Sequence, residues 1–255
     1  MSRLLAILAS ASLLLVALLA PNALADEQSN TSRRVLLVTG EDYPGHKWQT
    51  TTPALKGQLE QDPRLAIDVL DELTRLGSTQ LTDYDVVVMH FKNYDPKVPG
   101  KAGYDNLTKF VREGGGLVVV HFACGAFQEF KDDFVKVAGR VWNPEFRAHD
   151  PFGKFQVEVI DDEHPITRGL ASFETTDELY TCLDGQTPIK VLAEATSKVD
   201  QRRYPMAFVL TYGKGRVFHS VLGHDPAALN TPGVGTLFRR STAWAAGLAA
   251  EPKSE

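Results

Sequence analysis

The sequence is poor in cysteine and lacks the compact motifs by which many metal sites are recognised. Only Cys124 and Cys182 occur among its 255 residues. Two cysteines are too few for the disulfide framework of a small secreted domain, although they could pair in an oxidising compartment. Neither an HExxH nor a CxxC motif is present. A metal site would therefore have to be assembled from residues that lie far apart in the sequence.

Blocks of Lys and Arg are also absent, and the formal net charge is −5. A mildly acidic chain without basic clusters has little attraction for polyanions, so we expect no nucleic-acid partner and no anionic membrane partner. No internal repeat, low-complexity tract or interdomain linker interrupts the chain. These absences favour one globular domain.

The N-terminus has the pattern of an export signal. Arg3 precedes an apolar run at 4–20, Pro21 ends the run, and Ala-Leu-Ala at 23–25 is a small-x-small cleavage site. The run is short for a membrane span of about 20 residues, and no stop-transfer pattern follows. We therefore expect an exported protein, periplasmic or secreted, that is free of the membrane after cleavage. The expected divisions are a signal peptide at 1–25, a disordered lead-in at 26–33, one domain at 34–248 and a tail at 249–255.

The pattern of apolar residues predicts an α/β fold. Apolar runs without alternation, such as Leu-Val-Val-Val at 117–120, are typical of strands covered on both faces, as in a parallel sheet. Strands that alternate with helices then imply a doubly wound, mostly parallel sheet. In the second half, Gly-Lys-Gly at 213–215 predicts a hairpin, so we expect an antiparallel extension. The predicted strands are 33–40, 65–70, 85–91, 117–120, 155–160, 179–182, 190–193, 207–212 and 216–221, and the predicted helices are 50–61, 104–113, 126–137 and 236–246.

Four of the seven histidines stand near predicted strand ends. His46 follows the first strand, His90 lies near the end of the third, and His121 ends the central strand. The carboxyl ends of parallel strands meet at one edge of a sheet, where α/β folds place their ligands, so these three should lie near one another. Whether His224 joins them depends on the direction of the last strand. A single histidine of this kind could equally be a hydrogen-bonded structural residue.

Acidic residues matter beside such histidines because both metal sites and acid–base sites combine carboxylates with imidazoles. Asp177 and Glu178 are the best candidates, since they open a predicted strand; a solvated strand start is the alternative. Asp225 could orient the ring of its neighbour His224.

Cys124 lies just beyond the central strand, where some α/β enzymes carry a nucleophile. It lacks flanking glycines in the Gly-x-Cys-x-Gly form, and no His-x-Glu segment near the C-terminus offers a base. We therefore expect Cys124 to be a packing residue and keep a thiol hydrolase as an alternative. The glycines at 114–116 precede their strand and do not match a phosphate loop, so no nucleotide is expected.

Short segments of characteristic sequence follow one another along nearly the whole chain after residue 34. They are Val-Leu-Leu-Val-Thr-Gly at 35–40 with His46 after it, Tyr-Asp-Val-Val-Val at 84–88, the run 110–121 that ends in His121, His-Pro-Ile-Thr-Arg-Gly-Leu at 164–170, Asp-Glu-Leu-Tyr at 177–180, the run 212–224 that ends in His224, and Ala-Trp-Ala-Ala-Gly at 243–247. Each is modest alone. In this order the chain resembles the ThuA-like (trehalose utilisation) family, which has the class I glutamine amidotransferase-like fold.

The resemblance implies a flavodoxin-like sheet and a role in carbohydrate metabolism, beside enzymes that make and cleave keto-sugars. The family lacks the glutaminase triad, so the chain is not expected to be a functional glutaminase. Its polar site matches His46, His121, Glu178 and His224, with His149 as a further candidate.

We therefore expect a protein that binds or acts on a sugar or keto-sugar through acid–base chemistry, as an isomerase, lyase or hydrolase. His121 and Glu178 are the candidate catalytic residues, and Trp48, Asp177 and His149 are candidates for substrate binding. His46, His121, Glu178 and His224 are the candidate ligands of a divalent metal such as zinc. A non-catalytic carbohydrate-binding or accessory module is the main alternative, and a homo-oligomer is left open.

Overall fold

The computed structural model describes residues 32–41 and 45–251. The expected signal peptide, most of the expected lead-in and the last four residues of the tail lie outside the described residues. None of the helices in the described part of the chain has the length and apolarity that a membrane span needs.

The first half of the fold is a parallel sheet with its strands in the predicted places. β1 runs parallel to both β2 and β3, β3 to β4, and β4 to β11, a strand from near the end of the chain. β3 and β4 are apolar and buried along their whole length, which is typical of strands with both faces covered. The bounds of the five parallel strands are Arg33–Val38 for β1, Leu65–Leu70 for β2, Val86–Met89 for β3, Gly116–Val120 for β4 and Gly215–Ser220 for β11.

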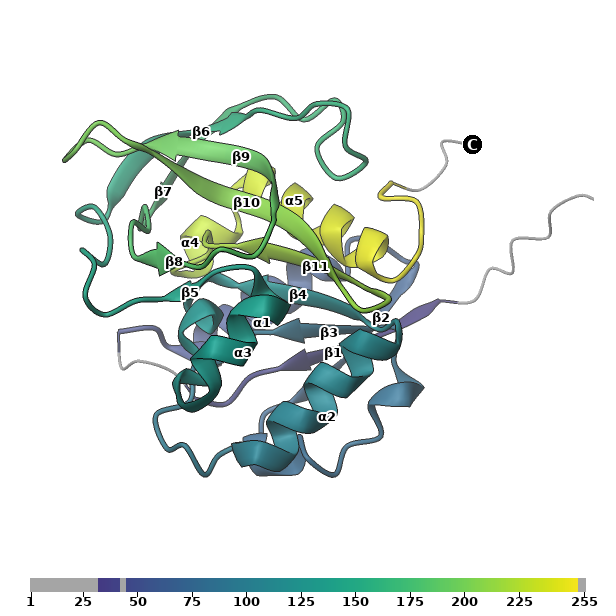
Figure 1. Ribbon diagram of the computed structural model, residues 1–255. Helices are drawn as coiled ribbons and strands as arrows, with labels where there is room; N and C mark the ends of the chain where they lie inside the picture. Colours follow the sequence, from purple (N-terminus) through teal and green to yellow (C-terminus); the bar gives the residue numbers. More distant parts are fainter. Residues whose placement is uncertain (1–31, 42–44, 252–255) are drawn as a thin grey trace, which may run out of the picture. The chain divides into compact units, whose positions relative to one another are not determined.

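The second half extends this sheet with antiparallel strands (Figure 1). The added strands are β6 (Gly153–Val159), β7 (Phe173–Asp177), β9 (Lys190–Thr196) and β10 (Arg203–Tyr212). Together the described strands form a nine-stranded sheet in the order β2-β1-β3-β4-β11-β10-β9-β6-β7. A separate pair consists of β5 (Val141–Trp142) and β8 (Leu183–Asp184). The predicted α/β fold, with a parallel sheet and an antiparallel extension, is thereby confirmed.

Helices cover both faces of the parallel sheet. Leu55 of α1 and Phe238 of α5 pack with Val35 on one face, and Leu107 of α2 and Phe134 of α3 pack with alternate strand residues on the other. A fully buried side chain of this size stabilises the fold by about 1.5–3 kcal/mol. The helices are α1 (Trp48–Leu59), α2 (Gly100–Glu113), α3 (Lys131–Ala138), the short α4 (Pro226–Leu229) and α5 (Pro232–Ala245).

Two predicted elements differ in the structure. The predicted strand 179–182 is wrong: β7 ends at Asp177, and only an isolated bridge joins Tyr180 to His149. The predicted helix 126–137 begins late, because Phe127 has a left-handed backbone (φ 52°) and a 3-10 turn follows it before α3. Glu178 therefore follows a strand, where sequence patterns had placed it at the start of one.

Candidate metal centre

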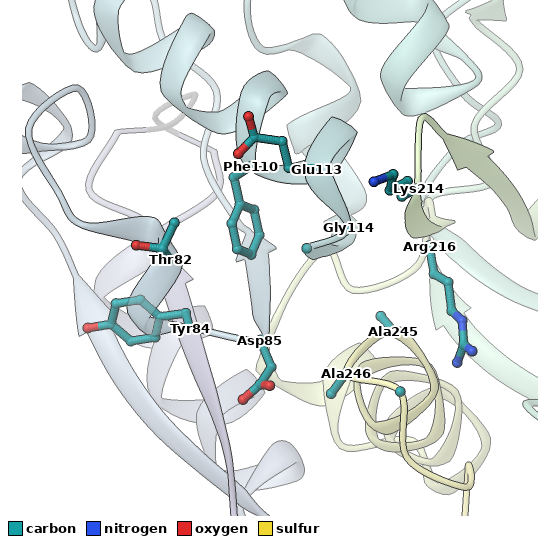
Figure 2. A pocket seen from close by; sticks show the side chains of 12 residues that line it. Thr82, Tyr84, Asp85, Phe110, Glu113, Gly114, Lys214, Arg216, Ala245 and Ala246 are labelled. Atoms are coloured by element: carbon teal, nitrogen blue, oxygen red, sulfur yellow. The ribbon is translucent and has the colours of Figure 1, made fainter.

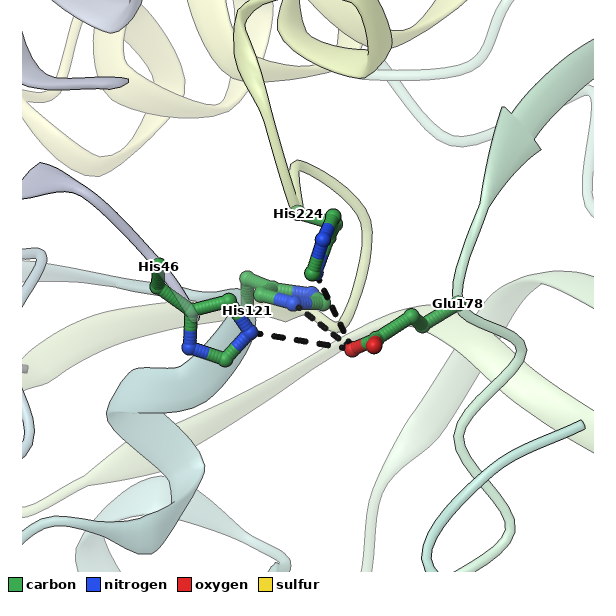
Figure 3. A group of neighbouring side chains, drawn as sticks. All are labelled: His46, His121, Glu178 and His224. Carbon is green, nitrogen blue, oxygen red and sulfur yellow. Dashed lines mark ion pairs between the residues drawn. The ribbon is translucent and has the colours of Figure 1, made fainter. Parts of the chain in front are cut away.

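Four segments that are distant in sequence bring His46, His121, Glu178 and His224 together (Figure 3). His46 precedes α1, His121 follows β4, Glu178 follows β7 and His224 comes after β11. One potential ligand atom from each lies within 4.8 Å of the others. His224 reaches the edge that holds His121 because β11 runs parallel to β4.

The three imidazoles converge on a single carboxylate oxygen. Glu178 Oε2 lies 3.7 Å from His46 Nε2, 3.5 Å from His121 Nε2 and 3.2 Å from His224 Nδ1. The His121 side chain is fully buried, and the exposed fraction of the Glu178 side chain is 12%. The centre is therefore largely shielded from water. Its ring nitrogens need hydrogen-bond partners or a cation from within the site.

Hydrogen bonds determine which ring nitrogens face the centre. His121 Nδ1 lies 2.6 Å from the carbonyl oxygen of Val221 and donates to it, which leaves the Nε2 lone pair directed at the centre. Tyr180 Oη is 3.1 Å from that same Nε2. His224 Nδ1 is buried and has no hydrogen-bond partner within the described ranges, although Glu178 Oε2 is nearby. Two electron-pair donors placed in this way are suited to sharing a cation.

The backbone at His121 is strained to make this arrangement. Its φ of +49° is in the left-handed region, which costs a side-chain-bearing residue about 1–3 kcal/mol and is concentrated at functional sites. The turn opens a 3-10 helix, η3 (His121–Gly125), directly at the end of β4. His121 thus occupies the sharp strand-to-helix turn at which related architectures carry a nucleophile.

The carboxylate of Glu178 is held in its charged form. Burial alone would raise the pKa of Glu178, but the facing rings of His121, His224 and His46 outweigh burial and lower that pKa well below its usual range. The centre therefore combines a negative charge with three nitrogen donors, a set that can hold a metal ion.

Asp177 supports the centre from behind. Its side chain is fully buried, and its oxygens accept backbone N–H bonds from Glu178 at 2.8 Å, Gly223 at 2.7 Å and His224 at 3.2 Å. Burial is the main cause that raises the pKa of Asp177. Since its oxygens are bonded to the backbone of two potential ligands, we assign Asp177 a positioning role instead of the predicted contact with substrate.

His149 lies at the side of the centre. Its Nε2 is 3.4 Å from Glu178 Oε1, the oxygen that does not face the other three rings, and its side chain is 32% exposed. His149 Nδ1 donates to the carbonyl oxygen of Asp150 at 2.7 Å. The Asp150 carboxylate in turn binds Arg147, Ser197 and the Lys198 backbone, which fixes the loop that carries His149.

Trp48 and His90, the remaining candidates, lie outside the group of four and differ in burial. Trp48 is partly buried and begins α1 two residues after His46. His90 is buried beneath Phe122, with ring centres 4.9 Å apart, and its Nδ1 lies 3.3 Å from Thr52 Oγ1. Phe122 also stacks on the ring of His46 at 4.8 Å.

Sequence reasoning missed two residues that shape the centre, Phe122 and Tyr180. Tyr180 stands two positions after Glu178 in the segment Asp-Glu-Leu-Tyr, so it could have been selected with Glu178. Phe122 directly follows His121, but an aromatic residue at the end of an apolar run is typical of a packing residue, so the sequence alone did not select it.

Cys124 is poorly placed for nucleophilic chemistry. Its side chain is fully buried, and burial raises its pKa well above the usual thiol value. Burial likewise raises the pKa of Cys182 to about 12, and both cysteines are free thiols. A protonated, buried thiol is inert, which argues against the thiol-hydrolase alternative.

A cavity of about 430 Å³ lies at the opposite ends of the parallel strands (Figure 2). Its charged lining includes Asp85, Glu113, Lys214 and Arg216, and it contains no histidine or cysteine. Asp85 is already paired with Arg33, and Arg216 binds the carbonyl oxygen of Trp244. This cavity therefore offers little of the chemistry that is gathered at the carboxyl ends.

Solved structures resemble this fold over most of its length. A protein from Parabacteroides merdae described as ThuA-like matches with a TM-score of 0.76 and 23% identity, over 88% of this chain and 94% of that chain. A second protein described as ThuA-like, from Bacteroides uniformis, matches with a TM-score of 0.64 and 19% identity, over 83% of this chain and 90% of that chain. A protein from Salmonella typhimurium LT2 described as cytoplasmic matches with a TM-score of 0.59 and 15% identity, over 83% of this chain and 99% of that chain. No curated protein matches the sequence significantly. At these identities, the structural likeness concerns the fold.

Fold and site together define a doubly wound α/β protein with a His/Glu centre at the carboxyl ends of its parallel strands. The sequence model of the ThuA family, described as trehalose utilisation, matches residues 34–245. The chain therefore belongs to the ThuA family, and this membership relates it to carbohydrate utilisation.

Proposed function

We propose that the protein is a metal-dependent enzyme that acts on a sugar or keto-sugar at the His/Glu centre. The observation that supports this most strongly is the convergence of three imidazole nitrogens on Glu178 Oε2, within 4.8 Å of one another. Among the described residues, the buried Nδ1 of His224 has no hydrogen-bond partner, and a cation between it and Glu178 Oε2, 3.2 Å away, would account for this placement.

The proposed metal is zinc. Neutral imidazoles with one carboxylate are a ligand set that zinc accepts in catalytic sites, and hard cations such as magnesium prefer sites built from oxygen alone. A divalent metal bound there would supply a Lewis acid for a carbonyl oxygen of the substrate. His46, His121 and His224 would hold it, together with Glu178 Oε2.

The proton chemistry is assigned to the other side of the Glu178 carboxylate. Its Oε1 faces His149, whose ring is partly exposed and can be reached by a substrate. A carboxylate and an imidazole at this distance can pass a proton between neighbouring carbons of a sugar. His121 and Glu178 remain the proposed catalytic residues, His121 as a ligand of the metal and Glu178 in proton transfer, with His149 beside the substrate and Trp48 as a surface for a sugar ring.

Two measurements test this function together. Elemental analysis of protein purified without chelator should find about one zinc per chain, and turnover of 3-keto-disaccharides should stop with chelator and return with zinc. His121→Ala should lose both metal and turnover. His164→Ala is the matched control, because His164 lies against Trp244 and outside the centre. Turnover that persists in metal-free protein would refute the proposal.

Sugar binding without turnover, unchanged in His121→Ala, would instead identify a carbohydrate-binding or accessory module. The fold provides no observation that favours this alternative over the enzyme. That nucleic acids do not bind remains a prediction for titration, and light scattering would decide whether the chain is a monomer or a homo-oligomer.

Export after cleavage behind Ala25 is also proposed, on the sequence pattern of residues 1–25. N-terminal sequencing of the protein from the periplasmic fraction or the medium should begin at Asp26. An intact N-terminus in the cytoplasmic fraction would contradict export.

A further inference from the structure

Lys92 has an unusual setting close to the His/Glu centre. It lies three residues beyond the end of β3, and its Nζ sits over the rings of Tyr94, at 5.0 Å, and Trp142, at 5.2 Å. Its side chain also runs along η3: a Cβ added to Gly125 would lie 3.1 Å from Lys92 Cδ and Cε. The ammonium group is thus held by two aromatic rings beside the turn that begins with His121.

A short series of contacts joins Lys92 to the centre. The ring of Trp142 packs edge-on against Tyr180 at 5.5 Å, and the hydroxyl of Tyr180 lies 3.1 Å from His121 Nε2. On the other side, Lys92 N donates to the carbonyl oxygen of Glu41 at 3.0 Å, which ties Lys92 to the loop that leads to His46. Lys92 is therefore separated from His121 by two aromatic side chains, Trp142 and Tyr180.

The charge of Lys92 is not balanced by a carboxylate. Within residues 32–41 and 45–251, no acidic oxygen lies within salt-bridge distance of its ammonium, whereas Lys56, Lys101 and Lys154 all have acidic partners. Cation–π contacts of this kind contribute only about 0.5–1 kcal/mol each at exposed sites. They also leave the N–H donors of a half-buried ammonium group available to an oxygen acceptor.

We propose that Lys92, Trp142 and Tyr94 form a subsite for the carboxylate of an acidic sugar. The two rings hold the ammonium in place, so little side-chain entropy is lost when an anion binds. A carboxylate gains both a charge-assisted hydrogen bond and the Coulomb attraction, whereas a neutral hydroxyl gains only the hydrogen bond. The subsite extends the sugar-binding role of the proposed function and rests on it for the reaction, but binding here requires no metal.

Calorimetric titration of the full chain, freed of metal with chelator, tests the subsite without turnover. The probes are D-glucuronate, D-glucose and acetate. We expect D-glucuronate to bind more tightly than either of the others, and Lys92→Met to weaken it about tenfold. Lys92→Arg should retain most of the affinity because it keeps the charge. Lys214→Met is the control for loss of one charge, since Lys214 lines the cavity at the opposite edge.

Equal affinity for D-glucuronate and D-glucose would overturn the proposal, as would acetate that binds as tightly as D-glucuronate. The proposal is also overturned if Lys92→Met binds D-glucuronate as tightly as Lys214→Met does, provided that the circular dichroism spectrum of Lys92→Met is that of the parent protein. If the protein carries no zinc and turns over no keto-sugar but binds D-glucuronate through Lys92, the proposed function fails and the subsite stands.

Discussion

Replacing Asp177 by Asn separates a positioning role from contact with a sugar. The two side chains have nearly the same shape, but Asn presents one acceptor and one donor where Asp presents two acceptors. Asp177 Oδ1 accepts the N–H groups of Glu178 and His224, and Oδ2 accepts that of Gly223 at 2.7 Å. In Asp177→Asn, the NH2 group can replace Oδ2 only by facing the N–H of Gly223, so at least one buried hydrogen bond is lost.

A buried donor left without its partner costs about 1–3 kcal/mol, and more where the lost partner is charged. We therefore expect Asp177→Asn to lower the free energy of unfolding by about 2–3 kcal/mol, which corresponds to a fall in Tm of about 4–12 °C for a domain of this size. Zinc affinity should fall as well, because the backbone of Glu178 and that of His224 are no longer fixed against each other.

Thermal unfolding and zinc titration of Asp177→Asn and Asp184→Asn measure both effects. Asp184 Oδ1 also accepts a backbone N–H, at 2.7 Å from Gly185, but it lies on β8 and apart from the four residues of the centre. An Asp177→Asn protein with unchanged Tm and unchanged zinc affinity, but weakened sugar binding, would refute the positioning role and favour direct contact with substrate.

Three further predictions concern residues around the centre. Burial lowers the pKa of His90 to about 3, so on acidification the unfolded chain takes up a proton before the folded one does. The free energy of unfolding should therefore fall as the pH drops below about 6.5. His90→Gln should remove roughly 2–3 kcal/mol of the fall in this free energy that urea unfolding measures between about pH 7.5 and 4.5. Phe122→Leu removes the ring stacked on His46 and should lower the affinity for zinc about three- to tenfold, as measured by competition with a chelator. Cys124→Ser should keep full zinc stoichiometry and turnover, because its thiol is buried and protonated; lost turnover with zinc still bound would revive the thiol mechanism.

The parallel half of the fold was predictable because its signals are local. Unbroken apolar runs mark β1, β3 and β4, and the edge to which parallel strands deliver their carboxyl ends follows from the topology alone. This reasoning placed His46 and His121 near one another. It could not decide on His224, because the direction of β11 is set by its pairing with β4 and by no feature of its own sequence.

Glu178 illustrates the limit of such reasoning. It follows β7, which is the edge strand of the antiparallel extension and the last in the sheet order, far from β4 along the sheet. It meets His121 only because the end of β7 packs on the loop after β11, where Asp177 binds the backbone of Gly223 and His224. A contact of this kind joins segments more than 40 residues apart in the sequence, and local periodicity does not encode it. Within the predicted strand 179–182, Tyr180 contacts His121 and makes only an isolated bridge to His149.

X-ray absorption at the zinc edge tests the central claim most directly. Protein loaded with one zinc per chain should show only nitrogen and oxygen neighbours, at about 2.0–2.2 Å, with imidazole scattering from three rings. His224→Ala should remove one of these rings, and Glu178→Gln should change the oxygen contribution while keeping all three. A spectrum with sulfur at about 2.3 Å, or a protein that retains no zinc at all, would contradict a centre built from His46, His121, Glu178 and His224.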